Sequence, residues 1–434
     1  MPGCFPRPHE PATSVPRPAT ARRRAGAHAA AAERRPARGG GGMKRALPPG
    51  FVATCACGFF SLSMLQMVAL ATPLWGGAIG LSAALLGVAV GARSILPLIY
   101  SIHFGALMDA VSVRRVIVLF ATLCILLPPL YPLLPQPAPL ILLQLLLGLA
   151  SATVWLAAQT AVAGLAAADS RVTARFSFFA SAGTVVAPLL LGLIWDRAGP
   201  GAGFALLSGW GAAVLLSGLF LPARPGHAPR RGLRWADLLP DPRTYLRAWQ
   251  VLRHPVGAFV IACTVLRLAG ISMQESFYPV LLQDIGLTAA SIGLLFAIGN
   301  LASSPATLAA GWWVRLTGST ARGLVAAVAL STVAITLTPA LGGFGALAVA
   351  IAVYGFGIGV SMPLIFDMLA RGLPAREQGL SAGLRGTANR LAAFALPVGL
   401  GLGAEALGIG TAFWVCGLLL LAAAGAVALA ARRL

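Results

Sequence analysis

Charged residues are scarce in this sequence. Only 10% of its 434 residues are charged and only 12 are acidic, whereas 58% are hydrophobic and the mean hydropathy is +0.84. A soluble domain carries about a quarter charged residues. A chain of this composition cannot cover its surface with polar groups, which excludes a soluble fold and predicts an integral membrane protein.

Motifs for metal binding and catalysis are also lacking. The six cysteines form no paired C-x-x-C motif, and the five histidines are scattered along the chain. We therefore expect neither a metal site nor a disulfide. The sequence has no H-E-x-x-H and no phosphate-binding G-x-x-x-x-G-K. These absences predict a protein that is not an enzyme, has no cofactor and is not driven by ATP.

Lysine is nearly missing, since Lys44 is the only one among many arginines. This bias is typical of GC-rich coding and favours a bacterial origin, hence an inner (plasma) membrane. The net charge of +20 is concentrated in the first 42 residues and in 223–255. Both segments flank hydrophobic runs, as the positive-inside rule expects of cytoplasmic segments, so we do not expect nucleic-acid binding.

The hydrophobic residues fall into long runs separated by Pro, Gly or charge. Crossing a bilayer takes about 20 apolar residues in a helix. Twelve such runs predict an all-α protein with twelve transmembrane helices, near 51–74, 83–104, 116–133, 140–164, 176–195, 203–222, 256–282, 288–310, 323–340, 345–369, 380–402 and 411–430. With a cytoplasmic N-terminus, the six outer loops hold one base, Arg197, and an even helix count places both termini in the cytoplasm.

Residues 1–42 are rich in Arg, Pro and Ala and contain no apolar stretch, so they are not a secretory signal. We expect a disordered tail, or an incorrectly assigned start with Met43 as the true first residue; a transit peptide is the alternative. The rest divides into a six-helix bundle at 43–222, a basic cytoplasmic linker at 223–255 and a second six-helix bundle at 256–434.

Two copies of one unit explain this division. "TPLWGGAIGLSAALLGVAVGA", which begins at Thr72, matches "YPVLLQDIGLTAASIGLLFAIG", which begins at Tyr278. Gly80 aligns with Gly286 at the same offset of 206 residues. Gly148 and Gly355 are 207 apart. Six spans return the chain to its starting side, so the two copies run in the same direction.

A charged turn interrupts the hydrophobic runs at "FGALMDAVSVRR", residues 104–115. It resembles the G-x-L-x-D-x-x-G-x-[KR]-[KR] turn of the major facilitator superfamily of secondary transporters, although several positions depart from that pattern. The resemblance implies a gate at the inner face that closes and opens by charge contacts. The gating residues would be Gly105, Asp109, Arg114 and Arg115 in the first copy, with Gly311 and Arg315 in the second. The alternative is a short charged loop that only fixes topology.

Ionisable side chains at membrane depth are costly and indicate functional sites. Arg93 lies twelve residues from Gly105, about 18 Å from the inner face at 1.5 Å per residue. In the family fold, the substrate path runs between the two bundles, and the helices that line it carry the candidate residues. The candidate proton carrier is Glu275. The candidate substrate-binding residues are Arg93, Arg267, Asn300, Asn389 and Arg390. A shared cavity would be positive and favour an anion. Alternatively, each arginine pairs with a carbonyl or with Glu275 and only ties helices together.

The resemblance therefore implies a secondary transporter that moves a small organic anion by alternating access, coupled to protons. Its partners would be the substrate, a coupling ion and the bilayer, and we expect a monomer. Export of hydrophobic or cationic compounds is an alternative, favoured by the glycine–proline pattern at Gly183, Pro188 and Gly192. A membrane sensor that kept the fold without transporting is another.

Overall fold

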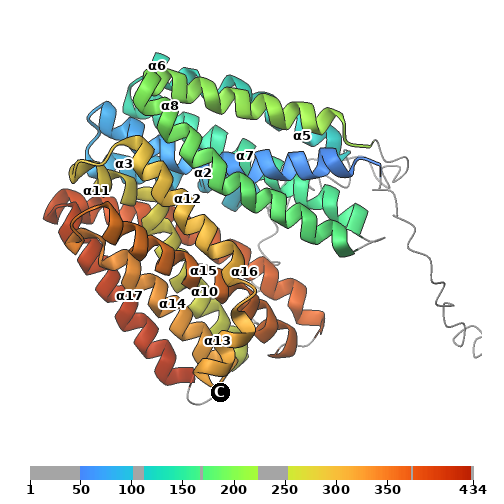
Figure 1. Ribbon diagram of the computed structural model, residues 1–434, viewed down its shortest axis with the longest axis vertical. Coiled ribbons are helices and arrows are strands. Elements are labelled where there is room, and N and C mark those ends of the chain that lie inside the picture. The colour runs from blue at the N-terminus through green and yellow to red at the C-terminus, as the bar shows by residue number, and fades with distance from the viewer. Residues whose placement is uncertain (1–48, 101–111, 167–169, 223–252, 373–374, 432–434) are drawn as a thin grey trace, which may run out of the picture. The chain divides into compact units, whose positions relative to one another are not determined.

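The chain folds into helices joined by short turns (Figure 1). The computed structural model describes residues 49–100, 112–166, 170–222, 253–372 and 375–431, and no residue within these ranges lies in a β-strand. All of them belong to one unit, 48–434. The expected tail at 1–42 and most of the expected linker at 223–255 lie outside the described residues.

Two groups of helices are named here by their place in the chain. The N-half comprises α2 (Phe51–Ala78), α3 (Ala83–Ala92), α5 (Val113–Leu126), α6 (Leu130–Leu133), α7 (Pro137–Ala166) and α8 (Ser170–Leu219). The C-half comprises α10 (Pro255–Ser276), α11 (Tyr278–Asp284), α12 (Ala289–Ala306), α13 (Ala310–Thr317), α14 (Thr320–Thr336), η3 (Thr338–Ala340), α15 (Phe344–Gly372), α16 (Ala375–Leu407) and α17 (Ile409–Ala431). Figure 1 shows the blue-to-green helices and the yellow-to-red helices as two packed groups.

Twelve predicted spans agree with this set of helices. Within the described residues, ten helices are long and apolar enough to cross a membrane, and α13 and α14 form a further candidate bent by 105°. The 49-residue candidate Arg171–Leu219 is broken at Gly199, whose backbone (φ 81°, ψ 176°) is not helical. Its two parts correspond to the predicted spans at 176–195 and 203–222, so twelve crossings result.

Prolines interrupt two of the predicted spans. Pro97 has no N–H to donate to the carbonyl of Arg93, and α3 ends at Ala92 with Arg93 as its C-cap. Pro279 likewise has no N–H for the carbonyl of Glu275, and α10 ends at Ser276. The predicted spans at 83–104 and 256–282 are thus interrupted, although Ala83–Tyr100 still forms one candidate span. The first interruption falls at Arg93, and the second follows Glu275 by two residues, at Phe277.

The internal repeat appears as matched turns. Gly80 and Gly286 both adopt positive φ, 67° and 87°, which glycine reaches without strain. Leu81 donates its N–H to the carbonyl of Gly76, and Leu287 donates to that of Leu282, so the two turns share one bonding pattern. Further along the chain, Gly199 and Gly408 also match, each with φ 81° and 209 residues apart.

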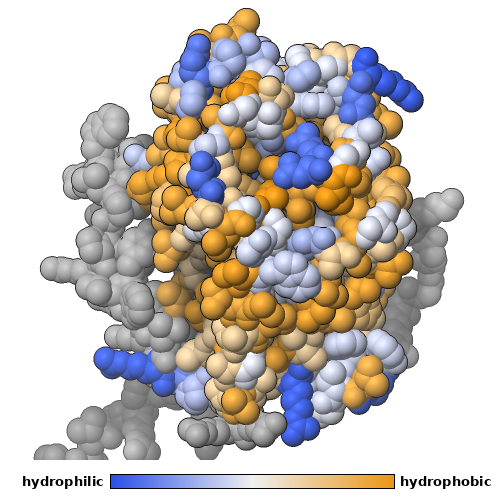
Figure 2. Space-filling model, turned by 90° about the vertical axis from the view of Figure 1, so that its left-hand side faces the viewer, coloured by the Kyte–Doolittle hydropathy of each residue, from blue (hydrophilic) through white to orange (hydrophobic). Residues whose placement is uncertain are grey.

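Much of the outer surface is apolar. Figure 2 shows hydrophobic side chains over most of one face. Large exposed side chains include Leu308 at 89%, Phe220 at 75% and Val52 at 72%. Contiguous apolar surface on this scale is unusual for a soluble monomer and suits contact with lipid tails.

Glycines let helices within each half approach closely. A Cβ on Gly148 of α7 would overlap the backbone of Arg93, and a Cβ on Gly355 of α15 would overlap the backbone of Gly299 in α12. Arg93 and Gly299 are 206 residues apart, so the same helix contact occurs in both halves. Membrane helices pack through small residues in this way because lipid supplies no hydrophobic driving force between them.

We predict that Gly355→Ala destabilises the fold, because its methyl group would push α15 away from α12. Overpacking of this kind costs about 1–3 kcal/mol. The measurement is equilibrium unfolding in detergent micelles. The matched control is Gly209→Ala in α8, where an added Cβ would meet nothing within 4 Å. Equal effects of the two substitutions would contradict the packing argument.

Candidate functional site

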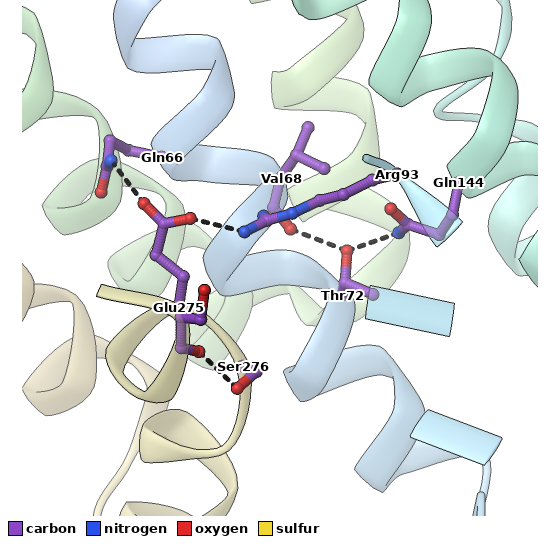
Figure 3. Close-up of polar contacts among 8 residues, drawn as sticks. Gln66, Val68, Thr72, Arg93, Gln144, Glu275 and Ser276 are labelled. Carbon is purple, nitrogen blue, oxygen red and sulfur yellow. Dashed lines mark hydrogen bonds and ion pairs between the residues drawn. The ribbon is translucent and has the colours of Figure 1, made fainter. Parts of the chain in front are cut away.

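A short ion pair joins the two halves (Figure 3). Nη2 of Arg93, at the end of α3, lies 2.5 Å from Oε2 of Glu275 in α10. Gln66 of α2 donates from Nε2 to the other carboxylate oxygen, Oε1, at 3.3 Å. The Arg93 and Glu275 side chains are only 15% and 21% exposed. Both oxygens of this carboxylate are therefore engaged by donors from the N-half.

The positions of both charged residues follow from their local sequence. Each lies four residues before a proline, so each stands where its helix is interrupted. Gly148 presses against the Arg93 backbone and holds it in place. Near the other partner, the Ser276 hydroxyl donates to the carbonyl of Ser272 at 2.5 Å. The pair thus links two fixed helix ends.

Arg390 of α16 adds a second guanidinium group to this site. It is partly buried and within electrostatic range of both Arg93 and Glu275. We call Gln66, Arg93, Glu275 and Arg390 the central cluster. It holds two guanidinium groups and one carboxylate, so positive charge is in excess where the two halves meet.

Arg267 lies elsewhere on α10 and faces α15. Its Nε donates to Oγ of Ser361 at 2.8 Å, and its Nη2 donates to the carbonyl of Ile358 at 3.4 Å. Arg385 and Tyr354 are in electrostatic range of Arg267. Tyr354 is also in electrostatic range of Glu275.

The two predicted asparagines lie apart from the central cluster contacts. Asn300 of α12 donates from Nδ2 to the carbonyl of Thr184 in α8 at 3.0 Å, which ties the two halves together. Asn389 of α16 is exposed. The structure thus brings Arg93, Glu275 and Arg390 together, and it places Arg267 and Asn300 in contacts with neighbouring helices.

The predicted gating turn is only partly described. Gly105 and Asp109 lie outside the described residues. Arg114 and Arg115 stand in the first turn of α5, whose N-cap Ser112 accepts from the N–H of Arg115 at 3.4 Å. In the C-half, Arg315 is exposed in the last turn of α13.

Packing does not require glycine at position 311, because a Cβ on Gly311 would meet nothing within 4 Å. The glycine that the turn does require is Gly318, which ends α13 with φ 81°.

Several buried polar atoms of the interior have no hydrogen-bond partner among the residues that the structure describes. Among them are the hydroxyls of Tyr278 and Tyr354. Gln144 of α7 donates to Oγ1 of Thr72 at 2.5 Å, while its own oxygen has no such partner. Tyr354 was missed altogether, although it precedes the repeated Gly355. A polar side chain inside an apolar span, next to a repeated glycine, could have indicated this position from the sequence.

The described residues contain no group of three or more His, Cys, Asp or Glu that could hold a metal. One G-x-S-x-G sequence occurs, at 379–383. The nucleophile elbow of hydrolases is a strand-to-helix turn, whereas this stretch lies inside α16. The pentapeptide therefore does not form such an elbow.

Comparisons with known proteins were made for sequence and fold. The family model of the Major Facilitator Superfamily matches residues 54–397 and 261–433. The nucleoside transporter NupG is similar in structure, with a TM-score of 0.70 and 13% identity over 88% of this chain and 98% of NupG. A search of curated proteins finds no match.

Two other solved structures are similar to a comparable degree. A bacterial homologue of the human lysosomal transporter Spinster, in an inward-facing and unoccupied conformation, gives a TM-score of 0.68 and 13% identity, covering 90% of this chain and 98% of that one. A POT family transporter in complex with 5-aminolevulinic acid gives 0.66 and 14%, covering 88% and 96%. At these identities the likeness concerns the fold alone.

We predict that Arg93 and Glu275 are energetically coupled. In a double-mutant cycle with Arg93→Met and Glu275→Gln, each single substitution leaves one charge without its partner. The double variant should be more stable than additivity allows, by roughly 1–3 kcal/mol. Equilibrium unfolding in detergent micelles measures all four proteins.

The matched control pair is Asp367 and Arg371, an i,i+4 ion pair at 2.7 Å in which the arginine side chain is 81% exposed. Exposed helical pairs of this kind contribute about 0.3–0.5 kcal/mol. The prediction is contradicted if the coupling free energy between Arg93 and Glu275 is no larger than that of this exposed pair.

Proposed function

Because the chain belongs to the major facilitator superfamily, we propose that it is a secondary transporter that carries a small organic anion by alternating access. The observation that supports this is the central cluster, in which two guanidinium groups and one carboxylate meet between the halves. A site between two halves is the place that alternating access requires, since relative movement of the halves exposes it to either side.

The choice of an anion rests on the charge of the site. Arg93 is already paired with Glu275, whereas the charge of Arg390 is not matched by a second carboxylate within the central cluster. An arriving carboxylate or phosphate would pair with Arg390 and supply the counter-charge. Arg267, which like Glu275 is in electrostatic range of Tyr354, would strengthen the attraction.

Coupling to protons is proposed through Glu275. A proton on this carboxylate would weaken its hold on Arg93, and the released guanidinium group would then bind the anion. Proton and anion would in this way favour one another's binding, which is the reciprocity that coupled transport needs. The two ligands would cross together without either leaving an uncompensated charge in the membrane.

The arrangement in the membrane is proposed from the basic residues. We place both termini and the segment 223–255 in the cytoplasm of a bacterial cell, with 43–222 and 256–434 as two six-helix bundles in the inner membrane. Arginines cluster in these segments, as the positive-inside rule expects. Asp109 with Arg114 and Arg115 would then form the gate on the cytoplasmic side. We propose a monomer as the transporting unit.

We predict that an organic anion, and not a lipophilic cation, stabilises the purified protein. A panel of both classes is screened for a rise in melting temperature, because a ligand that binds only the folded state stabilises it by mass action. A hit at a hundredfold excess over its Kd should add about 2.7 kcal/mol. The variant Arg390→Gln should weaken binding of that hit at least tenfold, roughly the value of one charge-assisted contact.

The matched control is Arg197→Gln, which removes the same charge from an exposed position and should leave binding unchanged. Arg267→Gln distinguishes a direct contact, with a comparable loss of affinity, from a helix tie that affects stability alone. Stabilisation only by lipophilic cations, unchanged in Arg390→Gln, would contradict the proposal and favour export of such compounds. A folded protein that no member of either class stabilises would favour the sensor.

A further inference from the structure

Asp196, near the end of the first part of α8, contacts the start of α12 in the other half. Its Oδ1 accepts from the N–H of Ala289 at 3.0 Å, and its Oδ2 accepts from the N–H of Ala290 at 2.7 Å. These are the first two residues of α12, and the N-cap Thr288 accepts from the next N–H, that of Ser291. The carboxylate therefore completes the capping of a helix from the opposite half.

Glu405 makes the equivalent contact at the start of α3. Its Oε2 accepts from the N–H of Ala84 at 3.2 Å, next to the N-cap Ser82. Asp196 and Glu405 are 209 residues apart, and Ala84 and Ala290 are 206 apart. The internal repeat thus produces the same clamp twice, once from the N-half to the C-half and once in the reverse direction.

A carboxylate suits this position for two physical reasons. The first N–H groups of a helix have no partner within the helix, and they carry the positive end of its dipole. A negatively charged acceptor satisfies both, and hydrogen bonds to an ionised acceptor are stronger than neutral ones. Each of the two acids thereby joins one half to the other.

Close packing beneath the clamps brings the acids within reach. A Cβ on Gly192 would overlap the carbonyl of Ala289, and a Cβ on Gly293 would overlap that of Pro188. The repeat supplies the matching contacts at the other clamp, where Gly401 lies against Ala83 and Gly87 against Pro397. With no side chains between these helices, the two halves touch through their backbones at the end that carries Gly80 and Gly286.

We propose that Asp196 and Glu405 form a two-point latch that holds this end of the protein closed and releases when this end opens during transport. The inference rests on the alternating-access function proposed above. Both acids are exposed, so water can replace the peptide N–H groups as their partner when the halves separate. Asp196, with two bonds, is the stronger point, and Glu405, with one, is the weaker.

Hydrogen exchange measures the latch directly and needs no substrate. In Asp196→Ala the N–H groups at the start of α12 lose their acceptor and should exchange faster. If the two acids act as one latch, loss of one contact favours separation of the halves and so loosens the other contact. Amide exchange at the start of α3, where Glu405 binds, should therefore also become faster, by roughly fivefold for exposed contacts of this strength. The variant with both acids replaced should exceed either single variant.

The matched control is Asp284→Ala, which removes an exposed acid from α11 and should leave exchange at both clamps unchanged. Where Asp196→Ala fails to fold, Asp196→Asn serves for the same comparison, since it removes the charge and keeps an accepting oxygen. Faster exchange confined to α12 would overturn the latch and leave a local helix cap, and unchanged exchange would overturn it as well. Either result is independent of whether any ligand binds, so failure of the latch and failure of the proposed function are told apart.

Discussion

The ion pair between Arg93 and Glu275 is the contact on which the centre of this protein depends. A charged side chain in the middle of a bilayer costs about 2.5–3.5 kcal/mol on insertion scales. Pairing the two, with Gln66 on the second carboxylate oxygen, removes much of this cost. Because the partners belong to different halves, the halves cannot separate there unless something replaces each partner. A proton for Glu275 and an anion for Arg93 are the replacements that fit.

The surrounding structure places this pair through residues that carry no charge. Pro97 and Pro279 end helices at its two members, and Gly148 packs against the Arg93 backbone. Packing of Gly87 and Gly293 at one end of the halves brings Asp196 and Glu405 to the helix starts that they cap. Close packing within each half and exposed polar clamps between the halves are the features that the proposed movement of the halves as units would require.

Sequence reasoning reached the fold because membrane helices and repeats leave strong signals. Hydrophobic runs gave the twelve spans, and the matched glycines at Gly80 and Gly286 gave the repeat. The depth of Arg93 and Glu275 could be estimated by counting residues. Pairing of an arginine with Glu275 could only be named as an alternative, since it depends on how the two halves meet. The direction in which each side chain points depends on the rotation of its helix about its own axis, which neighbouring helices set. The sequence could therefore not predict that Arg267 contacts Ser361 or that Asn300 contacts Thr184.

The most direct test of this account counts the protons that bind together with the anion. Calorimetric titration of a stabilising anion in two buffers of different ionisation enthalpy gives that number. The account predicts uptake of about one proton per anion bound, because binding opens the Arg93–Glu275 pair and leaves the carboxylate to be protonated. In Glu275→Gln the uptake should vanish while the anion still binds. Binding without proton uptake in the unaltered protein, or uptake that persists in Glu275→Gln, would contradict it.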